Sequence, residues 1–281
     1  MLVNATEMLK KAKAGHYAVG QFNINNLEWT KAILQTAQEL NSPVILGVSE
    51  GAGKYMGGFE TVVGMVKGLM KYLNITVDVA IHLDHGSSFE SCKNAIDAGF
   101  TSVMIDASSL PYDENVKMTK EAVCLAHPKN ISVEAEIGVL GGREAGNQKP
   151  LTKEEMYTDP DLAKKFVDDT NIDALACSFG TAHGIYKVKP ELDFDRIQRI
   201  NKLCNLPLVM HGGSGVSSED YVKAIKCGVR KINYYSYMSR EGVYAAREIL
   251  KKDITFYHEL ASYATSKMKE DVIRALKIFN K

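Results

Sequence analysis

Three of the seven histidines in the sequence lie at or just beyond the ends of short apolar runs. His85 ends the run VAIHLDH, His183 follows ALACSFG, and His211 lies near the end of LPLVMHG. Neutral imidazole is a common Zn2+ ligand, and three imidazoles with an open fourth position form a catalytic type of zinc site. A single histidine in such a place is more often a strand cap or a partner in a core hydrogen bond. Three of them on different runs favour a metal, so we predict that they bind Zn2+.

Asp84 directly precedes His85, which raises a question of geometry. A regular strand points adjacent side chains to opposite faces. Both residues can therefore serve one site only if the strand ends there, and Gly86 permits such a turn.

The segment HGGSG, residues 211–215, joins a candidate metal ligand to a glycine-rich turn and a helix that begins near Ser217. Glycines let the backbone approach a ligand closely, and exposed N–H groups at such a place can cradle a phosphate. A short glycine-rich turn alone can be a plain tight turn. Its position beside His211 favours the phosphate interpretation.

Eight apolar runs rich in Val, Ile and aromatic residues have the length of buried parallel strands, and they cover residues 18–24, 43–49, 79–85, 101–107, 132–138, 174–180, 206–212 and 230–236. Helix-like segments lie between them, at residues 27–40, 89–98, 114–126, 161–170 and 218–227. This alternation predicts an α/β fold of the (β/α)8 TIM-barrel type, as one domain over residues 1–281. We also expect a short helix before Gly15 and one or more helices over residues 257–279. Residues 138–157 are glycine-rich and polar, which predicts a long mobile loop.

The predicted strands end in polar residues, whereas their interiors are apolar. In a (β/α)8 barrel the active site lies at the carboxyl ends of the strands. The side chains at these ends are Asn23, Asn25, Ser49, Glu50, Asp84, His85, Asp106, Ser108, Glu134, Glu136, Ser178, Thr181, His183, His211, Ser214, Asn233 and Ser236. Eight polar ends in succession predict one catalytic site.

The charge balance, the apolar runs and the cysteines argue against several classes of protein. Lys plus Arg and Asp plus Glu both number 34, so the formal net charge is zero, which argues against a nucleic-acid protein or a polybasic membrane binder. No apolar run is long enough to span a bilayer, and no signal peptide is visible. Five cysteines without a CxxC pair indicate a reduced, cytoplasmic protein without a disulfide framework.

Several motifs together resemble the class II aldolases, which include fructose-1,6-bisphosphate and tagatose-1,6-bisphosphate aldolases. They are HLDHG (82–86), TSVMIDAS (101–108), VEAEIGVLGGRE (133–144), GTAHG (180–184), LVMHGGSGV (208–216) and KIN (231–233). These motifs are long and specific, and the resemblance extends to about residue 240.

The resemblance implies a reaction and a set of roles. The reaction is zinc-dependent, reversible aldol cleavage of a ketose (bis)phosphate to dihydroxyacetone phosphate and an aldehyde, through a metal-stabilised enediolate. His85, His183 and His211 would bind Zn2+, Asp84 would exchange a proton with the C4 hydroxyl, and Glu144 would handle the proton at C3. Glu136 would either orient a zinc-binding histidine or replace one as ligand. The substrate would be held by Asn23, Ser49, Gly184, Gly212, Gly213, Ser214, Asn233, Tyr234, Tyr235 and Ser236. Family members also use a monovalent cation, Na+ or K+, and form homodimers or homotetramers.

The chain departs from this family in the part that would hold the far end of the substrate. An Asp-Pro-Arg segment usual in the tail is missing, which leaves Arg240, Arg247 and Arg274 as possible replacements. Arg143 stands beside Glu144, where an acidic or small residue is common. These departures suggest an alternative: an aldolase of the same family that acts on a ketose 1-phosphate with a different acceptor aldehyde.

Three other functions are alternatives to a class II aldolase. A Schiff-base aldolase needs a lysine on an inner strand face, but residues 174–180 contain none and Lys231 lies at the start of its run. A metal-dependent hydrolase or isomerase would share the histidines without needing HGGSG and Asn233. A non-catalytic subunit that binds sugar phosphates would have no need of Asp84, Glu144 and the histidines together.

Overall fold

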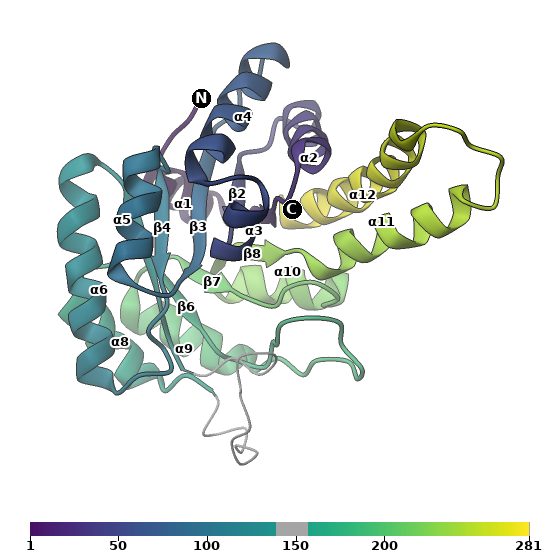
Figure 1. Ribbon diagram of the computed structural model, residues 1–281. Helices are drawn as coiled ribbons and strands as arrows, with labels where there is room; N and C mark the ends of the chain where they lie inside the picture. Colours follow the sequence, from purple (N-terminus) through teal and green to yellow (C-terminus); the bar gives the residue numbers. More distant parts are fainter. Residues whose placement is uncertain (139–156, 281) are drawn as a thin grey trace.

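Eight parallel strands form a closed barrel in the order β1 to β8 in the computed structural model, which describes residues 1–138 and 157–280 (Figure 1). The strands are β1 Val19–Asn23, β2 Val44–Val48, β3 Val79–Gly86, β4 Ser102–Ile105, β5 Ser132–Ile137, β6 Ala174–Cys177, β7 Leu208–Met210 and β8 Val229–Tyr234. The predicted (β/α)8 barrel is confirmed. β8 pairs with β1, which closes the sheet and leaves no exposed strand edge.

The strands are buried on both faces, which explains their nearly continuous apolar sequences. In β2, Val44, Leu46 and Val48 pack outward against the helices, whereas Ile45 points into the barrel. The alternation follows from the two-residue period of a strand. It assigns inner and outer faces to every strand and therefore decides which side chains reach the barrel axis.

Helices surround the barrel, and the five helical segments expected from the sequence are all present. The helices are α1 Ala5–Gly15, α2 Leu27–Glu39, α3 Glu50–Tyr55, α4 Phe59–Tyr72, α5 Phe89–Ala98, α6 Tyr112–Ala126, α8 Pro160–Thr170, α9 Phe194–Cys204, α10 Ser218–Cys227, α11 Ser236–Ile249 and α12 Tyr257–Phe279, with a 3-10 turn at His127–Lys129. Side chains of Asn26, Ser88, Asp159 and Ser217 accept hydrogen bonds from the first turns of α2, α5, α8 and α10. No helix among the described residues is long and apolar enough to cross a membrane.

α1 closes the amino end of the barrel. Its apolar side chains, among them Met8 and Leu9, pack with Val19, Ile45 and Ala80 from the inner faces of the strands. The carboxyl ends of the strands are therefore left as the face at which a ligand can enter the barrel.

α11 and α12 form a hairpin that projects from one side of the barrel, and α12 returns to pack beside α2 (Figure 1). The eighth strand is shorter than the run 230–236 predicted: it ends at Tyr234, and α11 begins at Ser236. The Tyr234 hydroxyl donates to Asp271 of α12 at 2.8 Å, so the buried ring anchors the hairpin to the barrel.

Candidate active site

A cavity of about 1470 Å3 opens at the carboxyl ends of the strands. Most of the side chains predicted from the sequence line it: Asn23, Ser49, Asp84, His85, His183, Gly184, Gly212, Ser214, Asn233, Tyr235 and Ser236. Residues far apart in the sequence thus converge as the barrel topology predicted. The far wall adds residues from α11 and from the segment after β6, which include Lys187, Ser239, Arg240, Tyr244 and Arg247.

A bulge in β3 turns both Asp84 and His85 toward this cavity. The register between β3 and β4 shifts between Leu83 and Gly86, and His85 has a φ of 53°. A positive φ is uncommon for a residue other than glycine, so this position is strained. β3 ends at Gly86, and the irregularity before this residue, rather than a turn alone, brings the two side chains together. A Cβ at Gly86 would lie 2.6 Å from the Met104 carbonyl oxygen, so the close approach of the strands requires glycine there.

The three predicted zinc ligands converge. A nitrogen from each of His85, His183 and His211 lies within 4.8 Å of the others, and His85 Nε2 lies 2.9 Å from His211 Nδ1. The rings of His85 and His183 meet edge to face with centroids 5.0 Å apart. This spacing suits three imidazoles that share one ion.

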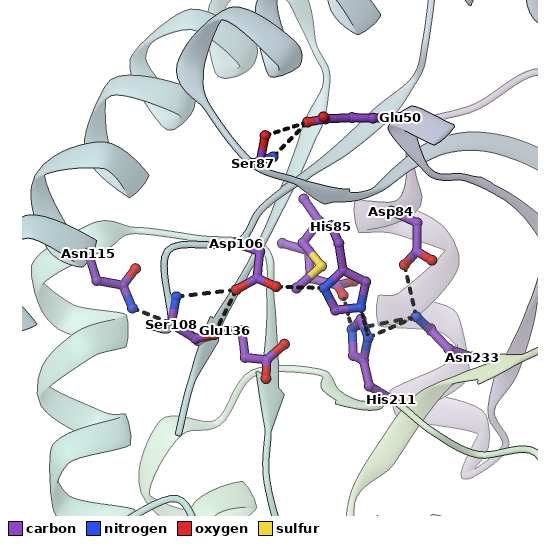
Figure 2. Close-up of polar contacts among 12 residues, drawn as sticks. Glu50, Asp84, His85, Ser87, Asp106, Ser108, Asn115, Glu136, His211 and Asn233 are labelled. Carbon is purple, nitrogen blue, oxygen red and sulfur yellow. Dashed lines mark hydrogen bonds and ion pairs between the residues drawn. The ribbon is translucent and has the colours of Figure 1, made fainter. Parts of the chain in front are cut away.

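Carboxylates hold the outer nitrogens of two of these rings. Asp106 lies 2.6 Å from His85 Nδ1 (Figure 2), and Glu134 lies 2.9 Å from His211 Nε2. When each carboxylate accepts an N–H from the outer nitrogen of a neutral ring, the inner nitrogen of that ring carries no proton. The lone pairs of His85 Nε2 and His211 Nδ1 then face each other across 2.9 Å. Such a contact is repulsive until a cation or a proton lies between the rings. The donor set therefore fits a zinc ion, with both rings oriented as outer carboxylates orient zinc-binding histidines.

Glu134 is the carboxylate that holds His211 Nε2. Glu136 belongs to a second group with His85 and Asp106, whose ligand atoms also lie within 4.8 Å of one another. Figure 2 shows Glu136 below Asp106, on the side of the strands that carries His85. Of the two interpretations from the sequence, this geometry favours Glu136 as an additional ligand over an orienting partner.

Two amides hold the Asp84 carboxylate. Asn23 Nδ2 donates to Asp84 Oδ2 at 2.7 Å, and Asn233 Nδ2 donates to Asp84 Oδ1 at 3.2 Å. Burial raises the pKa of Asp84, but the charges of His85, His211 and Lys231 outweigh burial and hold that pKa well below its usual range. The side chain is therefore an ionised, fixed proton acceptor at neutral pH.

The pKa values of the buried histidines are shifted in opposite directions by their surroundings. Burial and the charge of His85 lower the pKa of His211 to about 4, against the attraction of Glu134. Burial also lowers the pKa of His85, but Asp106, Asp84 and Glu136 reverse this effect and raise it to about 10. Burial and the charge of Lys231 lower the pKa of His82 to about 3. The site thus concentrates negative charge around His85, where a metal cation would lie.

The glycine-rich turn after β7 is held from two sides. The Tyr186 hydroxyl donates to the Gly212 carbonyl and accepts from the Ala182 N–H, both at 2.8 Å. Gly212 has a φ of 62°, and a Cβ there would lie 2.4 Å from the Ala182 carbonyl oxygen. Ser214 Oγ accepts from the Tyr235 N–H at 2.8 Å. These bonds join the segments that follow β6, β7 and β8 into one surface.

α11 begins at this surface. Its first residue, Ser236, lines the cavity, and its first turn has neither a side-chain cap nor an acidic residue. The first N–H groups of a helix lack partners within the helix and attract anions. Arg240 follows in the next turn, with its guanidinium 3.9 Å from the Tyr237 ring centroid. This end of the cavity therefore suits a phosphate.

Some predicted residues fall elsewhere. Tyr234 points away from the cavity and contacts Asp271, so the structure does not support its predicted contact with substrate. Gly213 lies beneath the cavity wall, where its N–H donates to the Asn233 carbonyl at 3.1 Å. Arg274 pairs with Asp271 and does not line the cavity. Arg143 and Glu144 lie outside the described residues.

The sequence alone gave no role to Asp106, Glu134 or Lys231. All three stand at inner-facing positions near strand ends, and the spacing of Lys231 and Asn233 by two residues places them on one face of β8. That periodicity was the available signal. Lys231 lies near the amino end of β8, as expected, but its long side chain reaches Asn233 Oδ1 at 2.9 Å.

Known proteins share this sequence and fold. The family model of class II fructose-bisphosphate aldolase matches residues 3–281. Fructose-bisphosphate aldolase of Geobacillus stearothermophilus is 55% identical over 256 residues, which are 91% of this chain and 88% of that protein. The Staphylococcus aureus enzyme of the same name is 51% identical over 280 residues, or 99% and 97% of the two chains. The crystal structure of the YdjI aldolase from Escherichia coli K12 matches with a TM-score of 0.87 and 35% identity, covering 99% of this chain and 97% of that one.

Proposed function

Because the chain belongs to the class II fructose-bisphosphate aldolase family, we propose that the cavity described above is its active site and that fructose 1,6-bisphosphate is its substrate. The protein is a metal-dependent aldehyde-lyase of glycolysis that reversibly forms dihydroxyacetone phosphate and an aldehyde. The observation that carries the proposal for the site is the contact between His85 Nε2 and His211 Nδ1 at 2.9 Å, with carboxylates on the outer nitrogens of both rings.

His85, His183 and His211 are the proposed zinc ligands, with Glu136 as an additional ligand. Zinc is a property of the family, and when bound it supplies a Lewis acid that polarises the ketone and stabilises the charge left after C3–C4 cleavage. Asp106 and Glu134 would each accept the N–H of the outer ring nitrogen, which directs the lone pair of the inner nitrogen toward the metal and holds the two rings in place.

Asp84 is the proposed acceptor of the C4 hydroxyl proton in cleavage and its donor in condensation. Its ionised carboxylate suits the first task, and the amides of Asn23 and Asn233 prevent it from turning away. The proton at C3 of the dihydroxyacetone phosphate half is assigned to Glu144 on the strength of the sequence motif alone.

The phosphate of the dihydroxyacetone phosphate half is proposed to lie over Gly184, Gly212, Ser214 and Ser236, beside the uncapped start of α11. The backbone of Gly212 packs closely against that of Ala182, whose carbonyl oxygen would lie 2.4 Å from a Cβ at Gly212. Carbonyl oxygens are hard ligands, and a site for Na+ or K+ is proposed next to the phosphate, as the family resemblance implies.

The far phosphate is proposed to bind Arg240, Arg247 and Lys187. All three line the cavity, and the buried Arg240 Nε has no hydrogen-bond partner among the described residues. Guanidinium groups suit phosphate because they donate in pairs. These cations weaken the alternative of a ketose 1-phosphate substrate, because they supply the charge that the missing Asp-Pro-Arg segment would otherwise have provided.

A homodimer or homotetramer is proposed from the outer surface of the α11–α12 hairpin. Large apolar side chains that do not line the cavity are exposed there: Leu250, Phe256 and Tyr257. Exposed apolar surface commonly marks a protein interface. All five cysteines are unpaired, which supports a reducing, cytoplasmic location.

The test is an assay of fructose 1,6-bisphosphate cleavage with and without a zinc chelator, together with condensation of dihydroxyacetone phosphate with a panel of aldehydes. We expect chelation to abolish turnover and glyceraldehyde 3-phosphate to be the preferred acceptor. Turnover that survives removal of all bound metal would contradict the proposed site. Preference for an unphosphorylated aldehyde would contradict the proposed substrate.

A further inference from the structure

A polar layer fills the barrel between the apolar end closed by α1 and the active site. Gln21, His82, Glu134 and Lys231 lie at inner positions of β1, β3, β5 and β8, and each is no more than 2% exposed. Below them the inner faces carry Val19, Ile45, Ala80 and Val209. Polar groups this deep cost free energy unless they are paired, so the layer needs an explanation other than stability.

Lys231 is the centre of this layer. Its ammonium group lies 2.8 Å from Glu134 Oε2 and donates to Asn233 Oδ1 at 2.9 Å. Glu134 in turn holds His211 through its other oxygen. One buried cation is therefore in contact with the groups that hold a zinc ligand and with an amide of the active site.

The bond to Asn233 decides which way that amide faces. An ammonium group only donates, so Asn233 must turn its oxygen toward Lys231 and its NH2 group upward. The NH2 group then lies 3.2 Å from both Asp84 Oδ1 and His211 Nδ1. In the flipped amide, the oxygen would face the ionised Asp84 carboxylate, and the two would repel each other.

We propose that Lys231 is a positioning residue for aldol cleavage, which acts by fixing the Asn233 amide so that its NH2 group faces Asp84 and the reacting end of the substrate. The inference rests on the proposed active site, and it adds a residue that never touches substrate. A buried ion pair such as Lys231–Glu134 can often be replaced by apolar residues with no loss of stability. Its position under Asn233 and His211 therefore indicates a role in orientation.

The test is a double-mutant cycle on kcat with Lys231→Met and Asn233→Ala in the zinc-loaded enzyme. Methionine keeps most of the volume of lysine and removes the donor. Loss of one oriented donor typically lowers kcat 100- to 1000-fold, and we expect roughly tenfold for Lys231→Met because the amide is retained but free to flip. At equal zinc content the double variant should be no slower than Asn233→Ala alone, because the proposed effect of Lys231 on kcat passes through that amide.

Zinc content and the free energy of unfolding are measured for every variant, since neither depends on turnover. The control is Arg230→Met, which removes a neighbouring buried cation whose guanidinium donates to the Ile225 and Val229 carbonyls on the outer side of the barrel. It should lower stability and leave kcat unchanged. If Lys231→Met fails to fold because Glu134 is left unpaired, the cycle is repeated in a Glu134→Gln background, where the carboxylate that pairs with Lys231 is absent.

Multiplicative effects of the two substitutions on kcat, or an unchanged kcat for Lys231→Met, would overturn the role of Lys231. If Asn233→Ala itself leaves kcat and KM unchanged, the proposed active site is at fault instead. The two failures are therefore distinguishable.

Discussion

The two ends of the cavity are built differently. At the metal end, the histidines, Asp84 and Asn233 lie on or just after strands, and Asp106, Glu134 and Asn23 hold them through direct hydrogen bonds. At the far end, the cations lie on α11 and on the segment after β6, and Lys187 and Arg247 are exposed. In the proposed site, groups whose chemistry needs exact placement would thus lie on buried strand ends, whereas cations that attract a phosphate would lie largely on exposed side chains.

Loss of a metal ligand should have the largest effect. His211→Ala removes a ligand and leaves Glu134 without its partner, so we expect zinc loss and a fall in kcat/KM of roughly 1000-fold or more. Zinc content by plasma mass spectrometry and turnover are measured together. His258→Ala, on an exposed position of α12, is the matched control. Full activity in zinc-free His211→Ala would contradict the proposal that this end of the cavity binds a catalytic metal.

Asp84→Asn separates proton transfer from metal binding. The amide keeps the size of the carboxylate but cannot accept the C4 proton, so kcat should fall about 100- to 10,000-fold while bound zinc is retained. Parallel loss of zinc and activity would instead make Asp84 a part of the metal site.

Asp106→Asn tests how much the orientation of the His85 ring contributes to zinc affinity. Removing a carboxylate that holds a zinc-binding histidine typically weakens metal affinity about 10- to 100-fold. Activity should therefore fall at limiting zinc and return at excess zinc, as measured by chelator competition and by titration of activity. The exposed Asp97→Asn is the control. Unchanged zinc affinity would show that the His85–Asp106 bond does not support the metal.

Arg240→Gln tests the far end. We expect KM for fructose 1,6-bisphosphate to rise about tenfold with little change in kcat, since a charge-assisted hydrogen bond contributes about 1.5–3 kcal/mol. Fructose 1-phosphate should show no such change. Arg199→Gln, on the surface of α9, controls for loss of charge. A large fall in kcat would mean that the far end takes part in the chemistry and that the two ends are not separate.

Tyr234→Phe should have the smallest effect on activity. The Tyr234 hydroxyl bonds Asp271 and does not reach the cavity, so kcat and KM should stay unchanged. Loss of this buried bond should lower the free energy of unfolding by about 1–3 kcal/mol, as measured by urea denaturation. An altered KM would restore Tyr234 to the substrate-binding residues that the sequence predicted.

The sequence determined the barrel and most of the site. Strands buried on both faces need continuous apolar runs, and barrel topology brings their carboxyl ends together, so His85, His183 and His211 could be joined without coordinates. The period of two residues likewise places Lys231 and Asn233 on one face. Apolar runs and the two-residue period are local patterns, so they can be recognised in the sequence alone.

Only the tertiary structure decided the contacts between strands. The bulge that turns Asp84 and His85 to one side depends on the register of β3 against β4. Glu134 holds His211, and Lys231 reaches Asn233 and Glu134 together, because strand tilt and stagger set which inner residues share a level. Tyr234 points away from the cavity, and its hydroxyl donates to Asp271 of α12. Each outcome depends on a partner at least 19 residues away, apart from the bond from Lys231 to Asn233, and no local pattern encodes such a distance.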